Sequence, residues 1–352
     1  MGGSDVDYII VGLGLAGIAF AEELRKQKKS FVVFEDTSQT SSLVAGGMYN
    51  PVILKRFTPV WNAIEQLEVA IPFYRILESE LEGSYDQPLP IYRTFKSIEE
   101  QNNWFVASDK PVLKEFMELD ILKVDSEYII APFKAGRLKH TGRVKVKELV
   151  NAYRDHLKKD NRLFEETFRH ERIITWDTHI EYKNILADKI VFCEGNGAKK
   201  NPFFKNLPLN GTKGELLTIH APQLKLEYVV KSAIFILPLG DDLYKVGATF
   251  NWSDKTNTPT SDGKEELLKK LDTVISCDYE IVDHEAGVRP TTGDRRPLLG
   301  RHKDNHRLAL LNGLGTRGVM IAPLMAKKLY QFLENGVALD KEIDILRFKQ
   351  KH

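Results

Sequence analysis

The chain has 352 residues, 42% of them hydrophobic, and its 50 Lys and Arg residues nearly balance 49 Asp and Glu residues for a net charge of +1. This length predicts two domains with sizeable cores, and the balanced charge argues against a strong general attraction to nucleic acid or membrane. Cys193 and Cys277 form no C-x-x-C pair and indicate free thiols of a reducing, cytoplasmic setting. His302 and His306 lie in a charged segment that favours a solvated loop, and no metal site is expected.

The first predicted elements are an apolar strand, residues 8–11, and a helix, residues 15–28. Gly12, Gly14 and Gly17 form G-x-G-x-x-G between them, in the context that a dinucleotide site requires. The first glycine permits a tight turn, the second lets backbone approach a pyrophosphate, and the third lets the helix pack on the sheet. Charged residues end the apolar run too early for a membrane span, and the leader lacks the basic residues of a signal peptide.

A second strand, residues 31–36, carries Glu35 near its end. An acid about 20 residues beyond the glycines binds ribose hydroxyls in such sites. The sequence therefore predicts an adenine dinucleotide and leaves NAD or FAD open at this point. The following segment, residues 37–56, is rich in Ser, Thr and Gly and is expected to cross a ligand face as a loop.

The rest of the chain alternates between nucleotide-type α/β elements and a β-rich unit, which points to two discontinuous domains. Helices are expected at about residues 61–81, 97–109, 145–158, 264–275 and 318–334. Strands are expected at about residues 91–97, 172–195, 213–221, 232–240, 243–250, 279–290 and 307–313.

Two later motifs carry candidate ligand residues. In "KIVFCEGNGA", an apolar strand ends in Gly195 and Gly197, where the backbone either approaches a cofactor or makes an ordinary strand-to-loop turn. In "EAGVRPTTGDRRPLLGRH", Arg289 lies at the end of a predicted strand among apolar residues. A guanidinium in such surroundings needs a partner. The planar guanidinium can bind the carboxylate of a ligand through two parallel hydrogen bonds. The alternative is an ion pair within the protein, with an acid such as Asp294.

The segment "LNGLGTRGVMIAP" places Gly313, Gly315 and Gly318 before a predicted helix. A helix N-terminus attracts negative charge, so this end is suited to the anionic edge of a reduced flavin. A glycine-rich turn that merely precedes an ordinary helix explains the same residues.

Together these motifs resemble the FAD-dependent amine and amino-acid oxidase family, which includes D-amino-acid oxidase, sarcosine oxidase and glycine oxidase. The resemblance runs nearly end to end, through "GLGLAG", "VFED", "SSLVAGGMYNP", "KGELL", "IFILPLGDDLYKVGAT", "GVRP…GDRRPLLGRH" and "GLGTRGVMIAP". The final motif and the turn "MYNP" are also similar to the FAD domain of the bifunctional enzyme that makes 5-methylaminomethyl-2-thiouridine in tRNA.

The resemblance implies an α/β fold. A Rossmann-like FAD-binding domain is expected from residues 1–58, 140–206 and 285–352. An interleaved α+β substrate-binding domain, built on a mostly antiparallel sheet, is expected from residues 59–139 and 207–284. FAD should lie extended between them, and non-covalently, because no cysteine stands in the C-terminal motif.

Family positions also imply individual roles. Arg289 should grip the substrate carboxylate, with Phe235, Met48 and Thr316 in the substrate pocket. The residues expected to contact FAD are Gly12, Gly14, Leu15, Ala16, Gly17, Glu35, Asp36, Ser41, Ser42, Gly46, Gly47, Met48, Ile173, Gly195, Leu314, Gly315, Thr316, Arg317, Gly318, Val319 and Met320.

Two departures from glycine oxidase argue against glycine as the substrate. That enzyme has a second carboxylate-binding arginine where this chain has Thr316, with Arg317 one residue later. Phe235 stands where it has a pocket tyrosine, so the hydroxyl is missing.

The implied reaction is oxidation of the C–N bond of a small, carboxylate-bearing amine or amino acid, by hydride transfer from the α-carbon to flavin N5. Such a reaction needs close positioning of the α-carbon rather than a strong side-chain base. Dioxygen is the usual electron acceptor in the family, and the sequence does not separate an oxidase from a dehydrogenase.

Three other functions compete with this one. The first is a flavoenzyme acting on a carboxymethylamino group of a tRNA uridine, with the basic segment "KAGRLKHTGRVKVK", residues 134–147, touching RNA phosphates. A solvated face is the favoured interpretation of that segment. The second is an NAD-dependent dehydrogenase, against which the C-terminal motif argues. The third is a flavin-binding protein without catalysis.

Overall fold

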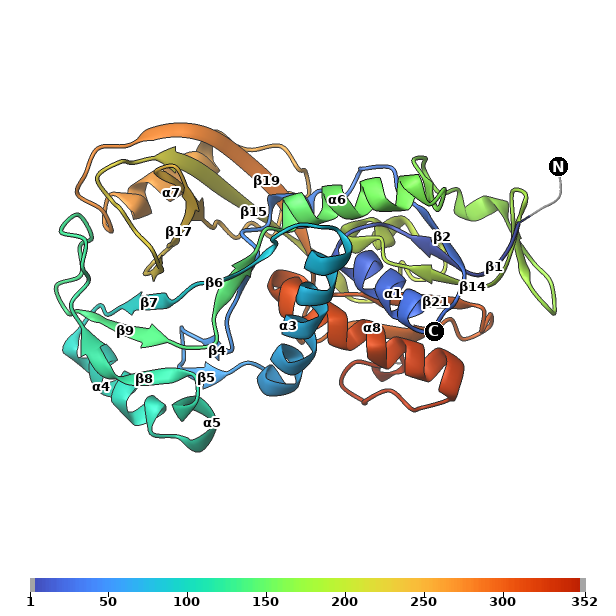
Figure 1. The fold of residues 1–352 in the computed structure, drawn as a ribbon, viewed down its shortest axis with the longest axis horizontal. Helices are drawn as coiled ribbons and strands as arrows, with labels where there is room; N and C mark the ends of the chain where they lie inside the picture. The colour runs from blue at the N-terminus through green and yellow to red at the C-terminus, as the bar shows by residue number, and fades with distance from the viewer. Residues whose placement is uncertain (1–3, 349–352) are drawn as a thin grey trace.

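The first of two large sheets is mostly parallel and lies at one end of an elongated molecule (Figure 1). The structure is a computed structural model that describes residues 4–348. Its parallel strands are, in spatial order, β11 (Leu163–Phe164), β2 (Phe31–Phe34), β1 (Ser4–Val11), β14 (Ile185–Phe192) and β21 (Leu308–Asn312). Antiparallel to these run β20 (Leu298–Arg301), beside β21, and the hairpin of β12 (Ile173–Thr175) and β13 (Ile180–Tyr182), beside β14.

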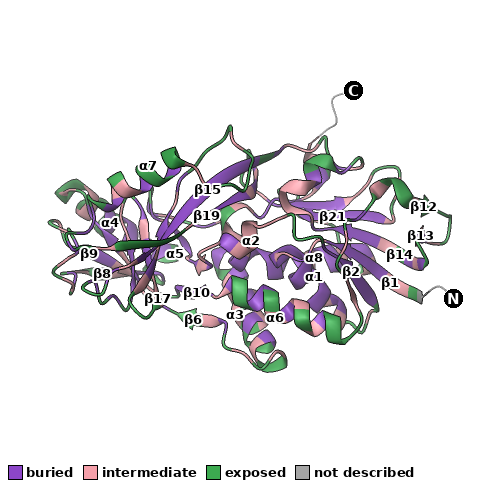
Figure 2. Cartoon of the chain, turned by 90° about the horizontal axis from the view of Figure 1, so that it is seen from above, coloured by how far each residue is buried: buried purple, intermediate pink, exposed green. Residues whose placement is uncertain are grey.

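Helices pack against this sheet and against one another. The N-terminal helix α1 (Leu15–Lys26) packs on α8 (Gly318–Asn335), and α8 also contacts α3 (Ala63–Glu80). A further helix, α6 (Val146–Lys159), has a buried apolar face and an exposed outer face (Figure 2). The helices α1, α3, α6 and α8 share one hydrophobic core with the side chains of β1 and β21 that face them.

The second large sheet has eight strands and lies at the other end of the molecule (Figure 1). All neighbours are antiparallel except β16 and β7, which are parallel. In spatial order the strands are β19 (Glu280–Thr292), β15 (Leu209–His220), β18 (Leu243–Gly247), β17 (Phe235–Gly240), β16 (Val229–Lys231), β7 (Ile91–Thr94), β9 (Ala135–Leu138) and β8 (Met117–Leu122).

The remaining elements are short. Helices α4 (Ile98–Ser108), α5 (Pro111–Lys114) and α7 (Ser261–Leu271) pack on the second sheet. Short strands form the small sheets of β3 (Met48–Tyr49), β10 (Gly142–Val144) and β6 (Asp86–Pro88), and of β4 (Val52–Ile53) and β5 (Thr58–Pro59). The last elements are the short helix α2 (Ser41–Val44) and the 3-10 turns η1 (His170–Arg172), η2 (Gly195–Lys200), η3 (Gly315–Arg317) and η4 (Ile345–Arg347).

The mixed α/β fold class predicted from the sequence is confirmed, and most predicted elements are present within a few residues. One helix is displaced: α7 begins at Ser261 rather than near residue 264, because the Thr260 hydroxyl accepts a hydrogen bond from the Gly263 N–H at 3.1 Å and caps the helix. The strand β19 crosses residue 285, where we predicted a domain boundary. The division into two domains therefore remains a proposal. In outline, each of the two large sheets corresponds to one of the proposed domains.

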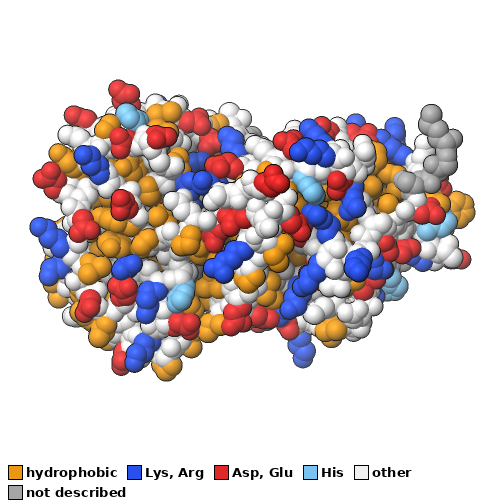
Figure 3. Space-filling model, viewed as in Figure 1, with side chains coloured by type: hydrophobic (Ala, Val, Ile, Leu, Met, Phe, Trp, Pro, Cys, Tyr) orange, Lys and Arg blue, Asp and Glu red, His pale blue; other side chains and the backbone are white. Residues whose placement is uncertain are grey.

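The basic segment at residues 134–147 forms β9 and β10, with its apolar residues mostly buried and its basic residues mostly toward the surface. Lys134, His140 and Lys147 are exposed, and Arg137, Lys139 and Lys145 are half-buried. Arg143 is buried and donates a hydrogen bond to the carbonyl of Pro238 at 2.8 Å. On the face drawn in Figure 3, side chains of both signs are interspersed. Within residues 4–348, no helix is both long and apolar enough to cross a bilayer.

Candidate cofactor and substrate site

One cavity of about 510 Å³ brings both glycine-rich turns together with the second sheet. Its walls come from the β1–α1 turn, the loop and short helix before β3, one face of the strands β15 to β19, and the turn that leads into α8. Segments from both ends of the chain and from its middle therefore meet in one space.

Steric contacts explain two glycines of the first turn. Gly12 has a φ of +100°, and a Cβ placed there would lie 2.6 Å from the carbonyl oxygen of Cys193. A Cβ on Gly17 would lie 2.0 Å from the carbonyl oxygen of Gly12. Gly14 differs, because its nearest neighbour is the Ser42 side chain, 3.0 Å from a built Cβ, and because it lines the cavity. The outer glycines thus hold strand and helix together, while the middle one leaves room for a ligand.

The start of α1 is open to the cavity. The helix has no side-chain cap and no acid in its first turn, so its N-terminal N–H groups and partial positive charge are available to an anion. Ser42 Oγ accepts one hydrogen bond from the Leu15 N–H at 3.3 Å.

Glu35 lies buried beside this turn. One of its oxygens accepts a hydrogen bond from the Leu13 N–H at 2.6 Å, and the other accepts one from the Thr37 N–H at 2.7 Å. Burial raises the pKa of Glu35, while these hydrogen bonds and Arg154, 3.9 Å away, oppose the change. Each carboxylate oxygen keeps a second lone pair, so the group is oriented and can still accept from ribose hydroxyls.

A second helix N-terminus faces the same cavity. The helix α8 also lacks a side-chain cap and an acid in its first turn, and Leu314 through Val319 line the cavity. Gly313 and Gly315 have φ values of +73° and +59°, which ordinary residues rarely adopt. Two helix N-termini and a buried carboxylate form a cradle that fits a dinucleotide with an anionic ring edge.

Arg289 lies on β19, and its guanidinium lies over Gly214 of β15. A Cβ on Gly214 would be 1.8 Å from the Nη2 atom of Arg289, so this glycine makes room for the arginine. The guanidinium donates a hydrogen bond to the Thr249 carbonyl at 3.3 Å and lies 4.8 Å from the Phe250 ring centre. Burial lowers the pKa of Arg289 to about 10, which leaves it charged at neutral pH.

No described carboxylate forms an ion pair with Arg289. Asp294 pairs with Arg347 instead, with 2.8 Å between its Oδ2 and the Arg347 Nε atom. The predicted alternative of an internal Arg289–Asp294 pair is therefore wrong, because the turn after β19 directs Asp294 toward the C-terminal segment.

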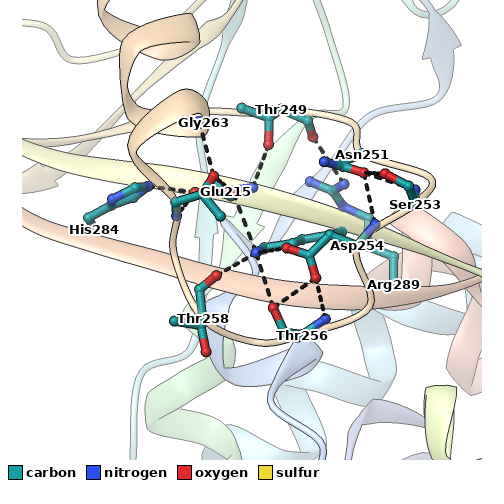
Figure 4. A network of polar contacts seen from close by, with 12 residues as sticks. Glu215, Thr249, Asn251, Ser253, Asp254, Thr256, Thr258, Gly263, His284 and Arg289 are labelled. Atoms are coloured by element: carbon teal, nitrogen blue, oxygen red, sulfur yellow. Dashed lines mark hydrogen bonds and ion pairs between the residues drawn. The ribbon is translucent and has the colours of Figure 1, made fainter.

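A buried polar network fixes the backbone around Arg289 (Figure 4). Lys213 is fully buried, and its ammonium lies 2.5 Å from Asp254 and 3.6 Å from Glu215. The Glu215 carboxylate also accepts hydrogen bonds from the N–H and hydroxyl of Thr260 and lies 2.9 Å from His284. Because Lys213 and Glu215 flank Gly214, these bonds tie the loop after β18 to the strand beneath the guanidinium.

The other predicted substrate residues lie along the same walls. The Phe235 ring fits against two glycines: a Cβ on Gly46 would be 3.5 Å from its Cζ, and one on Gly247 would be 2.8 Å away. Met48 and Thr316 also line the cavity. Arg317 lines it as well, and burial and Arg295 lower its pKa.

Most of the predicted site residues meet in this cavity. Those that line it are Gly12, Gly14, Leu15, Ala16, Glu35, Ser41, Ser42, Gly46, Gly47, Met48, Gly195, Phe235, Arg289, Leu314, Gly315, Thr316, Arg317, Gly318 and Val319. Four predicted cofactor residues are not in its lining: Gly17, Asp36, Ile173 and Met320. Gly17 and Met320 are buried in helices, Asp36 is exposed, and Ile173 begins β12 at the far hairpin.

Sequence reasoning missed several lining residues. Lys231, Phe250, Asn50, Gln39 and Glu194 line the cavity without having been predicted. Phe250 ends the predicted strand 243–250 and Lys231 directly precedes the predicted strand 232–240, but nothing local in the sequence shows that they face a ligand. Asn50 and Gln39 belong to the loop that we expected to cross a ligand face.

Comparison with known proteins identifies the family. The family described as "FAD dependent oxidoreductase" matches residues 7–331. The chain belongs to this family. As an FAD-dependent oxidoreductase it is an enzyme, and the cofactor that its cradle fits is FAD.

Similar proteins share its length or its fold. Glycine oxidase of Bacillus subtilis (strain 168) is 23% identical over 373 residues, which cover 94% of this chain and 93% of that protein. The bifunctional tRNA 5-methylaminomethyl-2-thiouridine biosynthesis protein MnmC of Marinobacter nauticus is 22% identical; the match covers 91% of this chain but only 54% of that protein. The crystal structure of glycine oxidase from Bacillus cereus ATCC 14579 has a TM-score of 0.78 at 19% identity and covers 95% of this chain and 96% of its own.

Proposed function

We propose that the enzyme oxidises the C–N bond of a small amine or amino acid that carries a carboxylate. One observation carries the proposal: Arg289 is half-buried, charged and without an acidic partner among the described residues, in the cavity that both glycine-rich turns also line. A guanidinium that loses much of its hydration and has no counter-ion is costly. A substrate carboxylate would supply that counter-ion.

The cofactor end of the cavity supports the same reaction. We propose that the α1 N-terminus with Ser42 holds the pyrophosphate, that Glu35 accepts from the ribose, and that the α8 N-terminus faces the flavin ring. When bound, FAD supplies the acceptor for the hydride that leaves the substrate α-carbon. Cys193 lines the cavity, but burial raises the pKa of its thiol and keeps it protonated, which supports a non-covalent flavin.

The protein's own part in this reaction is to bind and orient. Arg289 would fix the carboxylate, and Phe235 and Met48 would confine the carbon skeleton beside the flavin. No carboxylate lies in the substrate wall formed by the described residues, where the charged groups are cations. The amine would have to be neutral when the hydride leaves. Dioxygen is the electron acceptor that we propose.

A second candidate is oxidation of a carboxymethylamino group on a tRNA uridine, which the likeness to MnmC favours. Such a group also combines an amine with a carboxylate, so Arg289 would serve it equally. However, Arg143 of the basic segment is buried, charges of both signs are interspersed on the face drawn in Figure 3, and the match covers only 54% of that MnmC protein. We therefore place this function second.

The test is anaerobic reduction of the bound flavin by N-substituted glycines, D-amino acids and tRNA carrying the carboxymethylaminomethyl group. We expect the absorbance near 450 nm to bleach with a small carboxylate-bearing amine, as for any reduced flavin. Bleaching by the tRNA alone would establish the second candidate. A flavin that no amine reduces would contradict both.

A further inference from the structure

Lys231 is a second cation in the substrate wall for which the proposed reaction has no use. It ends β16 and lines the same cavity as Arg289 and Phe235. Its ammonium lies 5.9 Å from the centre of the Phe235 ring, so it extends over the wall rather than into solvent. The neighbouring cavity residues Ile91 and Val229 are apolar and buried.

The strand register places Lys231 on the face that carries Arg289's guanidinium. Lys231 is opposite Phe235, Phe235 is opposite Gly247, and Gly247 is opposite Leu216. Directly opposed residues of antiparallel strands point to the same face of a sheet. Three strand spacings separate the two ends of this row, or roughly 14 Å between Cα atoms.

The guanidinium of Arg289 lies over Gly214, two residues before Leu216 on β15. The guanidinium of Arg289 therefore lies near Leu216, at the end of this row of opposed residues that is remote from Lys231. The two cations stand at opposite ends of one wall, with Phe235 between them.

The protein itself provides Lys231 with no counter-ion. Among residues 4–348, no carboxylate forms an ion pair with it, and the charged groups that act on it are the cations Arg93, Lys96 and Lys270. The nearby acid Glu100 pairs with Arg93 at 2.5 Å, and Arg93 also donates to the carbonyl of Ser232 at 2.9 Å. Burial lowers the pKa of Lys231 to about 8, with the three cations adding to the effect.

Building on the proposed function, we infer that Lys231 binds a second anionic group of the substrate, at the end remote from the carboxylate that Arg289 holds. The substrate class is then an amine with two carboxylates. The ammonium of Lys231 is a point charge, and the guanidinium of its strand neighbour Arg93 is already bound to Glu100 and to the Ser232 carbonyl. No free arginine fork therefore adjoins Lys231 among the described residues to satisfy the several oxygens of a phosphate. A carboxylate therefore suits this end better than a phosphate.

The experiment compares matched acids that lack the amine and cannot react. Glutarate and pentanoate have the same carbon chain, and so do adipate and hexanoate, but only the first of each pair has a second carboxylate. Their affinities for the FAD-loaded enzyme are measured by calorimetry and by the change in the flavin spectrum. We expect at least one dicarboxylate to bind about tenfold more tightly than its matched monoacid, which corresponds to about 1.4 kcal/mol.

Variants assign that advantage to a residue. Lys231→Met should abolish it without weakening the monoacid, and Lys231→Arg should keep it. Lys96→Met, which removes an exposed lysine outside the cavity, is the matched control and should keep it. Because Lys231 has no partner to lose, its replacement by Met should not lower the melting temperature.

Three outcomes would overturn the inference. They are equal affinity of the paired acids for the unmodified enzyme, an advantage that survives in Lys231→Met, and tighter binding of 4-phosphonobutyrate than of glutarate. A failure of the proposed function would give a different result. In that case the Arg289→Leu variant would bind pentanoate with the same affinity as the unmodified enzyme.

Discussion

In the proposed site, the two ends of the cavity would recognise their ligands with different parts of the chain. The cofactor end offers backbone: two helix N-termini, and glycines that set the turns before them. The substrate end uses side chains, with Arg289, Phe235 and Lys231 projecting from one face of a sheet. A site built from backbone groups tolerates most side-chain substitutions except those at its glycines. A site built from side chains can change its ligand specificity through a single substitution. The predictions below separate the two ends.

The largest effect is expected from Arg289→Leu at the substrate end. Loss of a desolvated charge pair costs about 2–5 kcal/mol, so kcat/KM should fall by roughly 30- to several-thousandfold. FAD content and melting temperature should change little, because no described acid depends on this arginine. Steady-state kinetics, benzoate titration and thermal melts measure the three quantities. A large drop in melting temperature with intact benzoate binding would place Arg289 outside the site.

Gly17→Ala tests the cofactor end through packing alone. The new Cβ would lie 2.0 Å from the Gly12 carbonyl oxygen, and backbone cannot move aside cheaply. We expect a loss of about 1–3 kcal/mol in the free energy of unfolding, the usual range for overpacking, measured by urea denaturation. Gly293→Ala is the control, since nothing lies within 4 Å of its built Cβ. Equal stability of both variants would show that α1 does not need this close approach.

Glu35→Ala tests the side chain that the cofactor end does use. Its loss should weaken FAD binding by about 1–3 kcal/mol, the range for hydrogen bonds that involve a charged group. Fluorescence titration of the apoprotein with FAD measures the affinity, and Asp36→Ala serves as the exposed neighbouring control. If both variants bind FAD like the unmodified protein, Glu35 serves only to hold the backbone of the turn.

The smallest effect is a pH dependence at the substrate end. Lys231 is charged below its pKa of about 8 and neutral above it. The preference for glutarate over pentanoate should therefore be constant below about pH 8 and decline as the pH rises through that value. Arg289, with a pKa of about 10, keeps its charge over most of this window, so pentanoate binding should stay flat to about pH 9. A preference unchanged up to pH 9.5 would exclude Lys231 as its source.

The same lowered pKa has an opposite consequence for the fold. The folded-state pKa of Lys231 is about 8, below its ordinary value of 10.5, so the charged form destabilises the fold at neutral pH. That penalty should diminish as the pH rises from about 8 toward 10.5. In Lys231→Met the penalty is absent, and stability should vary less with pH across this range.

The sequence by itself determined the elements whose cause is local. Gly12, Gly14 and Gly17 between a strand and a helix define a turn by short-range sterics, and the apolar runs predict many strands of both sheets, although not β8, β9 and β16 of the second sheet. The family motifs then indicated Arg289 and most of the cavity lining. Helix ends such as the start of α7 were less certain, because a single capping hydrogen bond decides them.

Only the tertiary structure decided which charged groups meet. Asp294 is five residues from Arg289 in sequence, yet it pairs with Arg347, while Arg289 lies over Gly214 of a strand far earlier in the chain. Lys231 becomes part of the substrate wall only through the register of four strands. A charge interacts with whatever lies near it in space, and strand pairing sets that distance over long separations, so local sequence patterns do not reveal it.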